Sequence, residues 1–307
     1  MIDLSVSLGD IKLDNPVIPA SGTFGYGLEF AELYDINILG SFSIKGTTSA
    51  ERFGNPLPRI AETPSGMLNS VGLQNPGAEA VVNEYFPKLK KVYRKKVFAN
   101  VGGHDVVSYM KAAEILSRDD IVCALELNIS CPNVKEGGMA FGTDPVKAAE
   151  ITAAVKSVSE KPVFVKLSPN VTSVVDVAIA VAAAGADGIT LINTLLGMAV
   201  DRKTGRAITA VPHAGLSGAA VKPVALRMVH EVAGVVDLPI IGMGGIESAW
   251  DVIEFMSVGA SAVMVGSKNL TDPFICKKII EELPGVLNEI GVSDIKSIIG
   301  RTDRCAR

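Results

Sequence analysis

The sequence predicts a TIM (β/α)8 barrel, with an N-terminal hairpin in front of it and insertions at one rim. Helix-length segments separate eight short apolar runs, at residues 17–20, 39–45, 97–102, 124–130, 163–167, 188–193, 239–242 and 262–266. This alternation indicates a parallel sheet wrapped by helices. No GxGxxG motif follows an early strand, so a doubly wound sheet is the weaker alternative. Residues 1–307 are expected to form this one domain.

Helix signals fill the gaps between these runs. Asp144 and Pro145 supply an N-cap and a first-turn proline before a helix expected over residues 146–159. A second helix, expected over residues 172–184, is followed by Gly185, the residue type that often ends a helix. Both helices begin and end where strand-to-strand connections of a barrel require them.

The rim insertions and the hairpin stand outside this repeat. Residues 4–13 have the pattern of a hairpin that turns at Gly9. Three long segments follow predicted strands at one end of the barrel, namely residues 46–73, 132–143 and 195–215. The third is expected to have a hairpin tip at residues 202–206. Insertions on this face commonly become walls and lids of a site.

Composition argues against several classes of protein. A net charge of −4 gives no sign of general nucleic-acid affinity. The chain has no signal-peptide pattern, and its apolar runs are far shorter than the roughly 20 residues of a membrane span. The four cysteines have neither CxxC nor metal-ligand spacing. We therefore expect reduced thiols in a cytoplasmic protein and no metal site.

The fourth run carries the first chemical signal. Residues 124–130 alternate as a strand does, and Cys131 follows them directly, before Pro132 stops the ladder. A thiol just past a strand end is placed as a possible nucleophile or base at the rim of the barrel. Glu126 lies on the inward face of the same run, where a carboxylate needs a partner. Lys166 or Lys45 is the hypothesised partner.

Four polar side chains are predicted to meet inside the mouth of the barrel. Lys45, Asn100, Asn128 and Lys166 point inward near their strand ends, whereas their chain neighbours are apolar. Amide and ammonium groups are costly to bury without a polar ligand. The alternative is that they satisfy one another or bind water.

Glycines mark the other side of the expected site. Gly244 and Gly245 follow the seventh run, Gly266 and Ser267 follow the eighth, and Gly218 lies in the preceding loop. Backbone amides in such turns approach an anion closely, at the place where many TIM barrels hold a phosphate. Together with Lys166 and the asparagines, they indicate a phosphate and a planar polar ring, without defining which ring.

Four separated motifs give the sequence a family resemblance. Residues 19–25 (PASGTFG), 67–77 (MLNSVGLQNPG), 128–133 (NISCPN) and 217–227 (SGAAVKPVALR) resemble dihydroorotate dehydrogenase, and the resemblance runs essentially end to end. In having a cysteine rather than a serine at position 131, the chain resembles the soluble class 1 enzymes. The motif at residues 20–25 and the lack of an N-terminal membrane helix resemble class 1B, whose catalytic subunit passes electrons to NAD through a partner.

The resemblance implies that the chain oxidises dihydroorotate to orotate in pyrimidine (UMP) biosynthesis, with Cys131 as the base. It implies that FMN is held by Ser21, Lys45, Gly46, Asn100, Asn128, Lys166, Ile192, Gly218, Gly244, Gly245, Gly266 and Ser267. It implies that the substrate is held by Lys45, Asn69, Ser70, Val71, Gly72, Leu73, Asn128, Asn193 and Thr194. FAD and a [2Fe–2S] cluster would lie on the partner subunit, in a heterotetramer with two copies of each chain.

Three alternatives stay open. A class 1A-like homodimer would reduce fumarate directly, and it would share Cys131. A related barrel would reduce another pyrimidine, such as uracil or thymine, although Lys45 and the loop at residues 69–73 favour a ring that carries a carboxylate. A subunit that only relays electrons through a flavin would have lost turnover.

Overall fold

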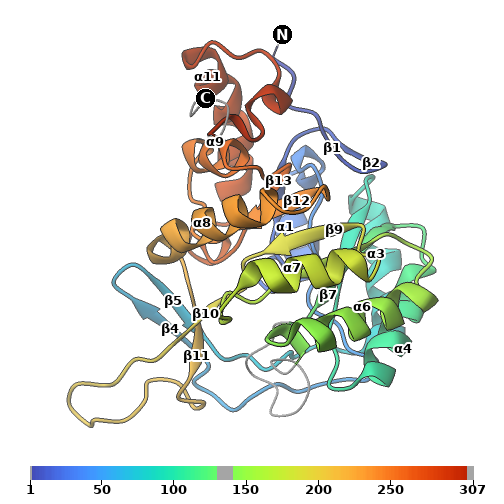
Figure 1. The fold of residues 1–307 in the computed structure, drawn as a ribbon. Helices are drawn as coiled ribbons and strands as arrows, with labels where there is room; N and C mark the ends of the chain where they lie inside the picture. Colours follow the sequence, from blue (N-terminus) through green and yellow to red (C-terminus); the bar gives the residue numbers. More distant parts are fainter. Residues whose placement is uncertain (1, 130–140, 303–307) are drawn as a thin grey trace.

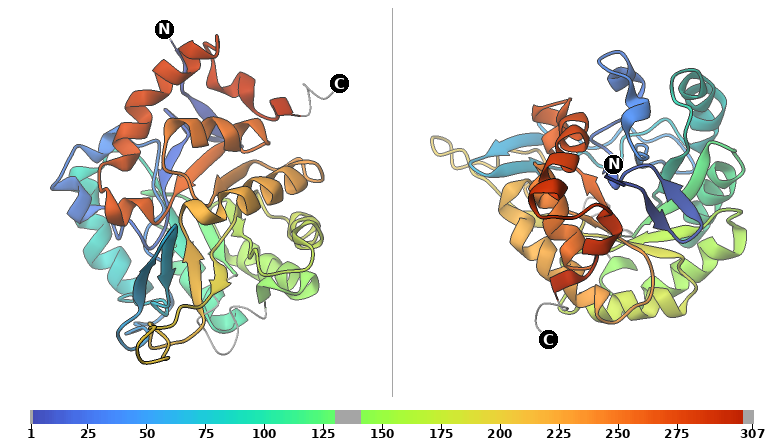
Figure 2. Two further views of the ribbon diagram at one scale, coloured as in Figure 1. Left: turned by 90° about the vertical axis from the view of Figure 1, so that its left-hand side faces the viewer. Right: turned by 90° about the horizontal axis from the view of Figure 1, so that it is seen from above.

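Seven parallel strands form the wall of a barrel in a computed structural model of the chain, which describes residues 2–129 and 141–302 (Figures 1 and 2). Within these residues the hydrogen-bonded order is β3-β13-β12-β9-β8-β7-β6. The strands are β3 (Val17–Pro19), β6 (Val97–Val101), β7 (Val122–Asn128), β8 (Val163–Lys166), β9 (Gly188–Leu191), β12 (Ile240–Met243) and β13 (Ala262–Val265). The predicted fold class is confirmed.

The eighth position of the barrel is filled by a segment that is not a regular strand. Ser43 makes an isolated parallel bridge to Phe98 of β6, and its N–H donates to the Pro19 carbonyl of β3 at 3.0 Å. The next bridge to β6 occurs only at Thr47, whose N–H donates to the Asn100 carbonyl at 2.9 Å, and on the other side the Lys45 N–H donates to the Gly25 carbonyl rather than to β3. The prediction of a strand at residues 39–45 is therefore wrong, although the segment does lie between the first and third strands.

Helices cover the outside of the barrel (Figure 2). The longer ones are α4 (Val106–Ser117), α6 (Pro145–Val158), α7 (Val174–Ala183), α8 (Lys222–Ala233), α9 (Ala249–Ser257) and α11 (Ile275–Glu289). The shorter ones are α1 (Leu28–Ala31), α2 (Ala78–Ala80), α3 (Phe86–Val92) and α10 (Lys268–Thr271), with a π-helical turn η2 (Val81–Tyr85) and 3-10 turns η1 (Ile36–Ile38), η3 (Ala219–Val221) and η4 (Ile295–Ile298). As predicted, Asp144 caps α6 by accepting from the Val146 N–H at 2.9 Å, and Gly185 (φ +92°) follows α7.

Additional strands lie at the two ends of the barrel (Figure 1). The N-terminal hairpin pairs β1 (Val6–Leu8) with β2 (Ile11–Leu13) across the predicted turn. At the other end, parts of the first and third insertions combine into one sheet in the order β10-β11-β5-β4, which was not predicted. Its strands are β4 (Ile60–Thr63), β5 (Gly66–Asn69), β10 (Leu195–Gly197) and β11 (Ala214–Ser217). The expected tip at residues 202–206 is present, since the Asp201 N–H donates to the Arg206 carbonyl at 2.8 Å.

Buried apolar side chains from Val6 to Ile298 form a continuous cluster. That residues 1–307 form one domain stays a prediction. None of the helices described here is long and apolar enough to cross a membrane. Most of the second predicted insertion, residues 132–143, lies outside the described residues.

Candidate functional site

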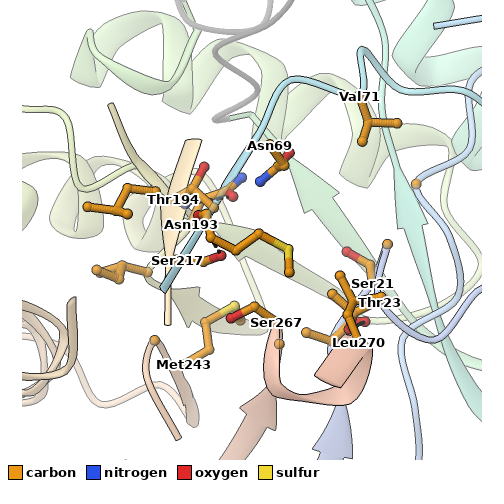
Figure 3. A pocket seen from close by; sticks show the side chains of 18 of the residues that line it. Ser21, Thr23, Asn69, Val71, Asn193, Thr194, Ser217, Met243, Ser267 and Leu270 are labelled. Carbon is orange, nitrogen blue, oxygen red and sulfur yellow. Dashed lines mark hydrogen bonds between the residues drawn. The ribbon is translucent and has the colours of Figure 1, made fainter. Parts of the chain in front are cut away.

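One cavity opens at the carboxyl ends of the barrel strands, beneath the four-stranded sheet (Figure 3). In this view Asn69, Asn193 and Thr194 lie on one side, and Ser21, Thr23 and Ser267 lie on another. Every residue expected to hold a cofactor lines this cavity: Ser21, Lys45, Gly46, Asn100, Asn128, Lys166, Ile192, Gly218, Gly244, Gly245, Gly266 and Ser267. The structure thus brings together groups from both halves of the chain.

The cavity wall is cationic. Lys45 and Lys166 line it, and none of its described lining residues is an aspartate or a glutamate. Lys166 and Asn128 are only 5% and 8% exposed, so their polar groups lie in a site that is largely shielded from solvent. Charges shielded in this way act more strongly on a ligand than surface charges do. The wall therefore favours a ligand that carries phosphate or carboxylate groups.

Glu126 lies behind this wall and finds the partner hypothesised for it. Its Oε1 atom is 3.4 Å from the Lys166 Nζ atom, and its side chain is fully buried. The Asn100 amide nitrogen donates to the other carboxylate oxygen at 2.6 Å. The carboxylate is thus compensated by charge and by hydrogen bonding, as burial requires.

The glycine turns make close contact with one another. Gly218 (φ +107°) lies after β11, and a Cβ atom placed on it would be 2.5 Å from the Cα atom of Gly66 in β5. Gly245 (φ +79°) lies after β12, and its Cβ atom would be 2.9 Å from the Gly218 carbonyl oxygen. Only glycine fits both positions, because the backbone conformation and the space exclude a side chain. At Gly266 a Cβ atom would meet nothing within 4 Å, so this glycine borders open space in the cavity.

The loop after β5 forms the wall nearest the four-stranded sheet. Asn69, Val71, Gly72 and Leu73 line the cavity, and Leu73 has a left-handed backbone (φ +57°). This conformation is uncommon for leucine and requires support from its surroundings. Asn75 provides it, since its side-chain nitrogen donates to the Leu73 carbonyl at 2.7 Å.

The structure differs from the sequence prediction at several individual residues. Ser70 is buried and does not line the cavity, whereas the other described substrate candidates do. Thr23, Met243 and Leu270 line the cavity and were missed. Thr23 lies inside the motif at residues 19–25, and Met243 lies between the seventh run and Gly244, so their positions were an available signal. Cys131 lies outside the described residues.

The other described cysteines are poorly suited to chemistry. Burial raises the pKa of Cys123 to about 12, and burial also raises the pKa of Cys276. Both thiols therefore stay protonated near neutral pH, which disfavours nucleophilic or basic roles. Cys305 lies outside the described residues.

A cationic mouth with tight glycine turns defines a barrel enzyme of the kind that binds a phosphorylated cofactor. The chain belongs to the dihydroorotate dehydrogenase family, whose model matches residues 3–287. It is 58% identical over 299 residues to the dihydroorotate dehydrogenase B (NAD(+)) catalytic subunit of Bacillus cytotoxicus, covering 97% of this chain and 96% of that protein. It is 57% identical, with the same coverage, to the proteins of the same name from Bacillus pumilus and Bacillus thuringiensis. The family prediction from the four motifs is confirmed.

Proposed function

We propose that this chain is the catalytic subunit of an NAD-linked dihydroorotate dehydrogenase, which oxidises (S)-dihydroorotate to orotate in pyrimidine biosynthesis. The observation that carries the proposal is the cationic cavity that joins the glycine turns to Lys45, Lys166 and the asparagines. Such a cavity suits a phosphorylated ring cofactor and a carboxylated substrate together.

FMN fits the residues that the structure brings together. Asn100 Oδ1 is buried and has no hydrogen-bond partner among the described residues, so it can accept from a donor group of a ligand. The open space at Gly266 and the turns at Gly218, Gly244 and Gly245 suit the phosphate end. Lys45 and Lys166 suit the polar edge of the ring. When bound, FMN supplies the acceptor for a hydride.

The substrate would lie against the loop after β5. Asn69, Asn193 and Thr194 offer amide and hydroxyl groups to a pyrimidine ring, and Lys45 offers a charge to its carboxylate. Asn193 is itself held in place, because its side-chain oxygen accepts from the Thr194 N–H at 2.8 Å. A rigid set of amide groups favours a substrate that carries ring amides as well as a carboxylate over a simple carboxylic acid.

Cys131 is proposed as the general base. Desaturation of the substrate removes a proton from one ring carbon and a hydride from its neighbour. The sequence places Cys131 three residues after Asn128, at the end of β7. A free thiol has a pKa near ~8.5, so a modest local shift would make it a base at neutral pH.

Electrons are proposed to reach NAD through a second subunit. The relatives named above are called NAD(+)-linked catalytic subunits, and such a name implies a partner chain. This chain's isolated cysteines cannot supply a cluster ligand set. We therefore assign FAD and the [2Fe–2S] cluster to the partner, in a cytoplasmic heterotetramer with two copies of each subunit.

Anaerobic reduction of the purified chain tests the proposal. Dihydroorotate should bleach the yellow flavin absorbance, whereas dihydrouracil should leave it unchanged. NAD reduction should require the partner subunit. Flavin that dihydroorotate does not bleach would support a relay subunit, bleaching by dihydrouracil would support another pyrimidine reductase, and rapid fumarate reduction by the chain alone would support a class 1A-like enzyme.

A further inference from the structure

The buried carboxylate of Glu126 has no role in the steps proposed above. It lies on β7, inside the barrel, with no exposed surface. It does not line the cavity, but two residues that bond to it do. A charge held one layer behind a ligand site acts on that site through its neighbours and through space.

The described residues give Glu126 polar contacts on both of its oxygens. Oε2 accepts from the Ser43 hydroxyl at 2.8 Å and from the Asn100 amide nitrogen at 2.6 Å. Oε1 accepts from the Thr190 hydroxyl at 3.1 Å and pairs with Lys166 Nζ at 3.4 Å. The carboxylate thus ties together the segment at Ser43 and strands β6, β8 and β9, on both sides of its own strand.

This arrangement determines which atom Asn100 presents to the cavity. Because its nitrogen is bonded to Glu126, its Oδ1 atom faces away from the carboxylate and has no partner in the described part of the chain. A Cβ atom on Gly46, which lines the cavity, would lie 2.8 Å from this oxygen. Asn100 is therefore set as an acceptor for a ligand N–H group.

The same carboxylate reduces the positive charge at the site. Lys166 lines the cavity and is 5% exposed, so solvent screens its charge only weakly. Among the described residues, Glu126 supplies the carboxylate that lies within ion-pair distance of Lys166. The charge that acts on a bound ring is thus that of a lysine and glutamate pair rather than that of a lysine alone.

We propose that Glu126 is a positioning residue of the flavin site, which orients Asn100 and Lys166 and lowers the midpoint potential of the bound FMN. The proposal rests on the FMN site proposed above. A negative charge behind the ring opposes the uptake of electrons, so removing it stabilises the reduced flavin. Lys166, left without its counter-charge, adds to this effect.

The Glu126→Gln variant of the full-length, FMN-loaded chain tests the proposal by anaerobic redox titration. Glutamine keeps the size of the side chain and removes its charge. At a fixed potential the ratio of reduced to oxidised FMN should rise at least tenfold, which corresponds to about 30 mV for a two-electron couple. The matched control is Thr190→Val, which removes one buried donor but keeps the charge, and it should change the ratio less than twofold. A shift in Glu126→Gln no larger than that of the control overturns the proposal.

A paired variant keeps the test decisive if Glu126→Gln does not fold. Replacing both members of a buried ion pair is often tolerated, so Glu126→Gln with Lys166→Met should fold. Its FMN should be at least tenfold more reduced, at a fixed potential, than that of Lys166→Met alone. Equal potentials in these two variants would reject the role of Glu126. Failure of the wild-type chain to bind FMN would instead reject the proposed function, and this inference with it.

Discussion

Replacing Asn75 by alanine should weaken substrate binding while leaving FMN in place. Asn75 is 5% exposed, and its side chain links the left-handed Leu73 to Gly77 and to Thr48. Its nitrogen donates to the Leu73 carbonyl at 2.7 Å and to the Thr48 hydroxyl at 2.8 Å. Its oxygen accepts from the backbone N–H groups of Thr48 at 3.1 Å and Gly77 at 2.9 Å.

The size of the stability loss in Asn75→Ala follows from the backbone groups that lose a hydrogen-bond partner. Two buried backbone N–H groups would be left without an acceptor, at about 1–3 kcal/mol each, so the loss of folding stability should be about 2–6 kcal/mol. The loss falls on a loop that lines the substrate side of the cavity. Without the bond from Asn75, Leu73 is free to leave its uncommon backbone conformation. We therefore expect the KM for dihydroorotate to rise at least tenfold, with a smaller change in kcat.

Steady-state kinetics, FMN absorbance and urea unfolding together measure these effects. Asn15→Ala is the matched control, because Asn15 is a buried asparagine (4% exposed) whose side chain bonds to Val17 and Ile38, near the start of β3. The Asn15→Ala variant should lose about 1–3 kcal/mol of folding stability, and its KM for dihydroorotate should be unchanged. An unchanged KM in Asn75→Ala, or an equal rise in the control, would refute the reasoning.

Three further predictions concern the base, the phosphate turn and a nearby ion pair. Cys131→Ala should keep the flavin spectrum and lose dihydroorotate oxidation by about 10²-fold or more, and wild-type turnover in this variant would reject the base assignment. Gly266→Val should place a side chain in the open cavity and release FMN, while the free energy of unfolding of the apo-chain, measured in urea, changes by less than about 0.5 kcal/mol. The control is Gly285→Ala in α11, where the added carbon also meets nothing within 4 Å, and it should retain FMN. Burial acts to raise the pKa of Asp251, but bonds from Lys222, Ser248 and the Glu247 N–H outweigh it and lower that pKa. Asp251→Asn should therefore lose about 1–3 kcal/mol of folding stability at pH 7. This loss relative to the wild type should shrink as the pH falls below the unfolded pKa of about 3.9 and through the lower folded pKa. A loss of stability that is constant with pH would contradict this reasoning.

The barrel and its ligand-facing residues were predictable because both follow from local patterns. Alternation along a strand determines which side chains point inward, so Asn100, Asn128 and Lys166 could be assigned to one mouth from the sequence. The capping of α6 by Asp144 was predictable for the same reason, since it depends on residues next to one another in the chain.

The features that escaped prediction depend on contacts between distant segments. The four-stranded sheet pairs Leu216 with Leu68 across nearly half of the chain, and neither insertion alone shows that pairing. The segment at residues 39–45 looked like a strand, but the Lys45 N–H bonds to the loop at Gly25 instead of continuing the ladder. Leu73 gives no local sign of its left-handed backbone, because Asn75 and Thr48 impose it.

The buried network around Glu126 lies one layer behind the ligand-facing wall, and folding stability alone does not explain it well. Replacing a buried ion pair such as that of Glu126 and Lys166 by apolar residues is often neutral or stabilising, because desolvation offsets the attraction between the charges. A chain selected for folding alone would gain little from a carboxylate at the centre of its barrel. The network becomes understandable once the cavity is considered, because it fixes an acceptor on Asn100 and balances the ammonium of Lys166 at the wall where a charged ligand would bind. The polar layer around Glu126 therefore belongs to the binding site, whereas the apolar side chains around it form the hydrophobic core.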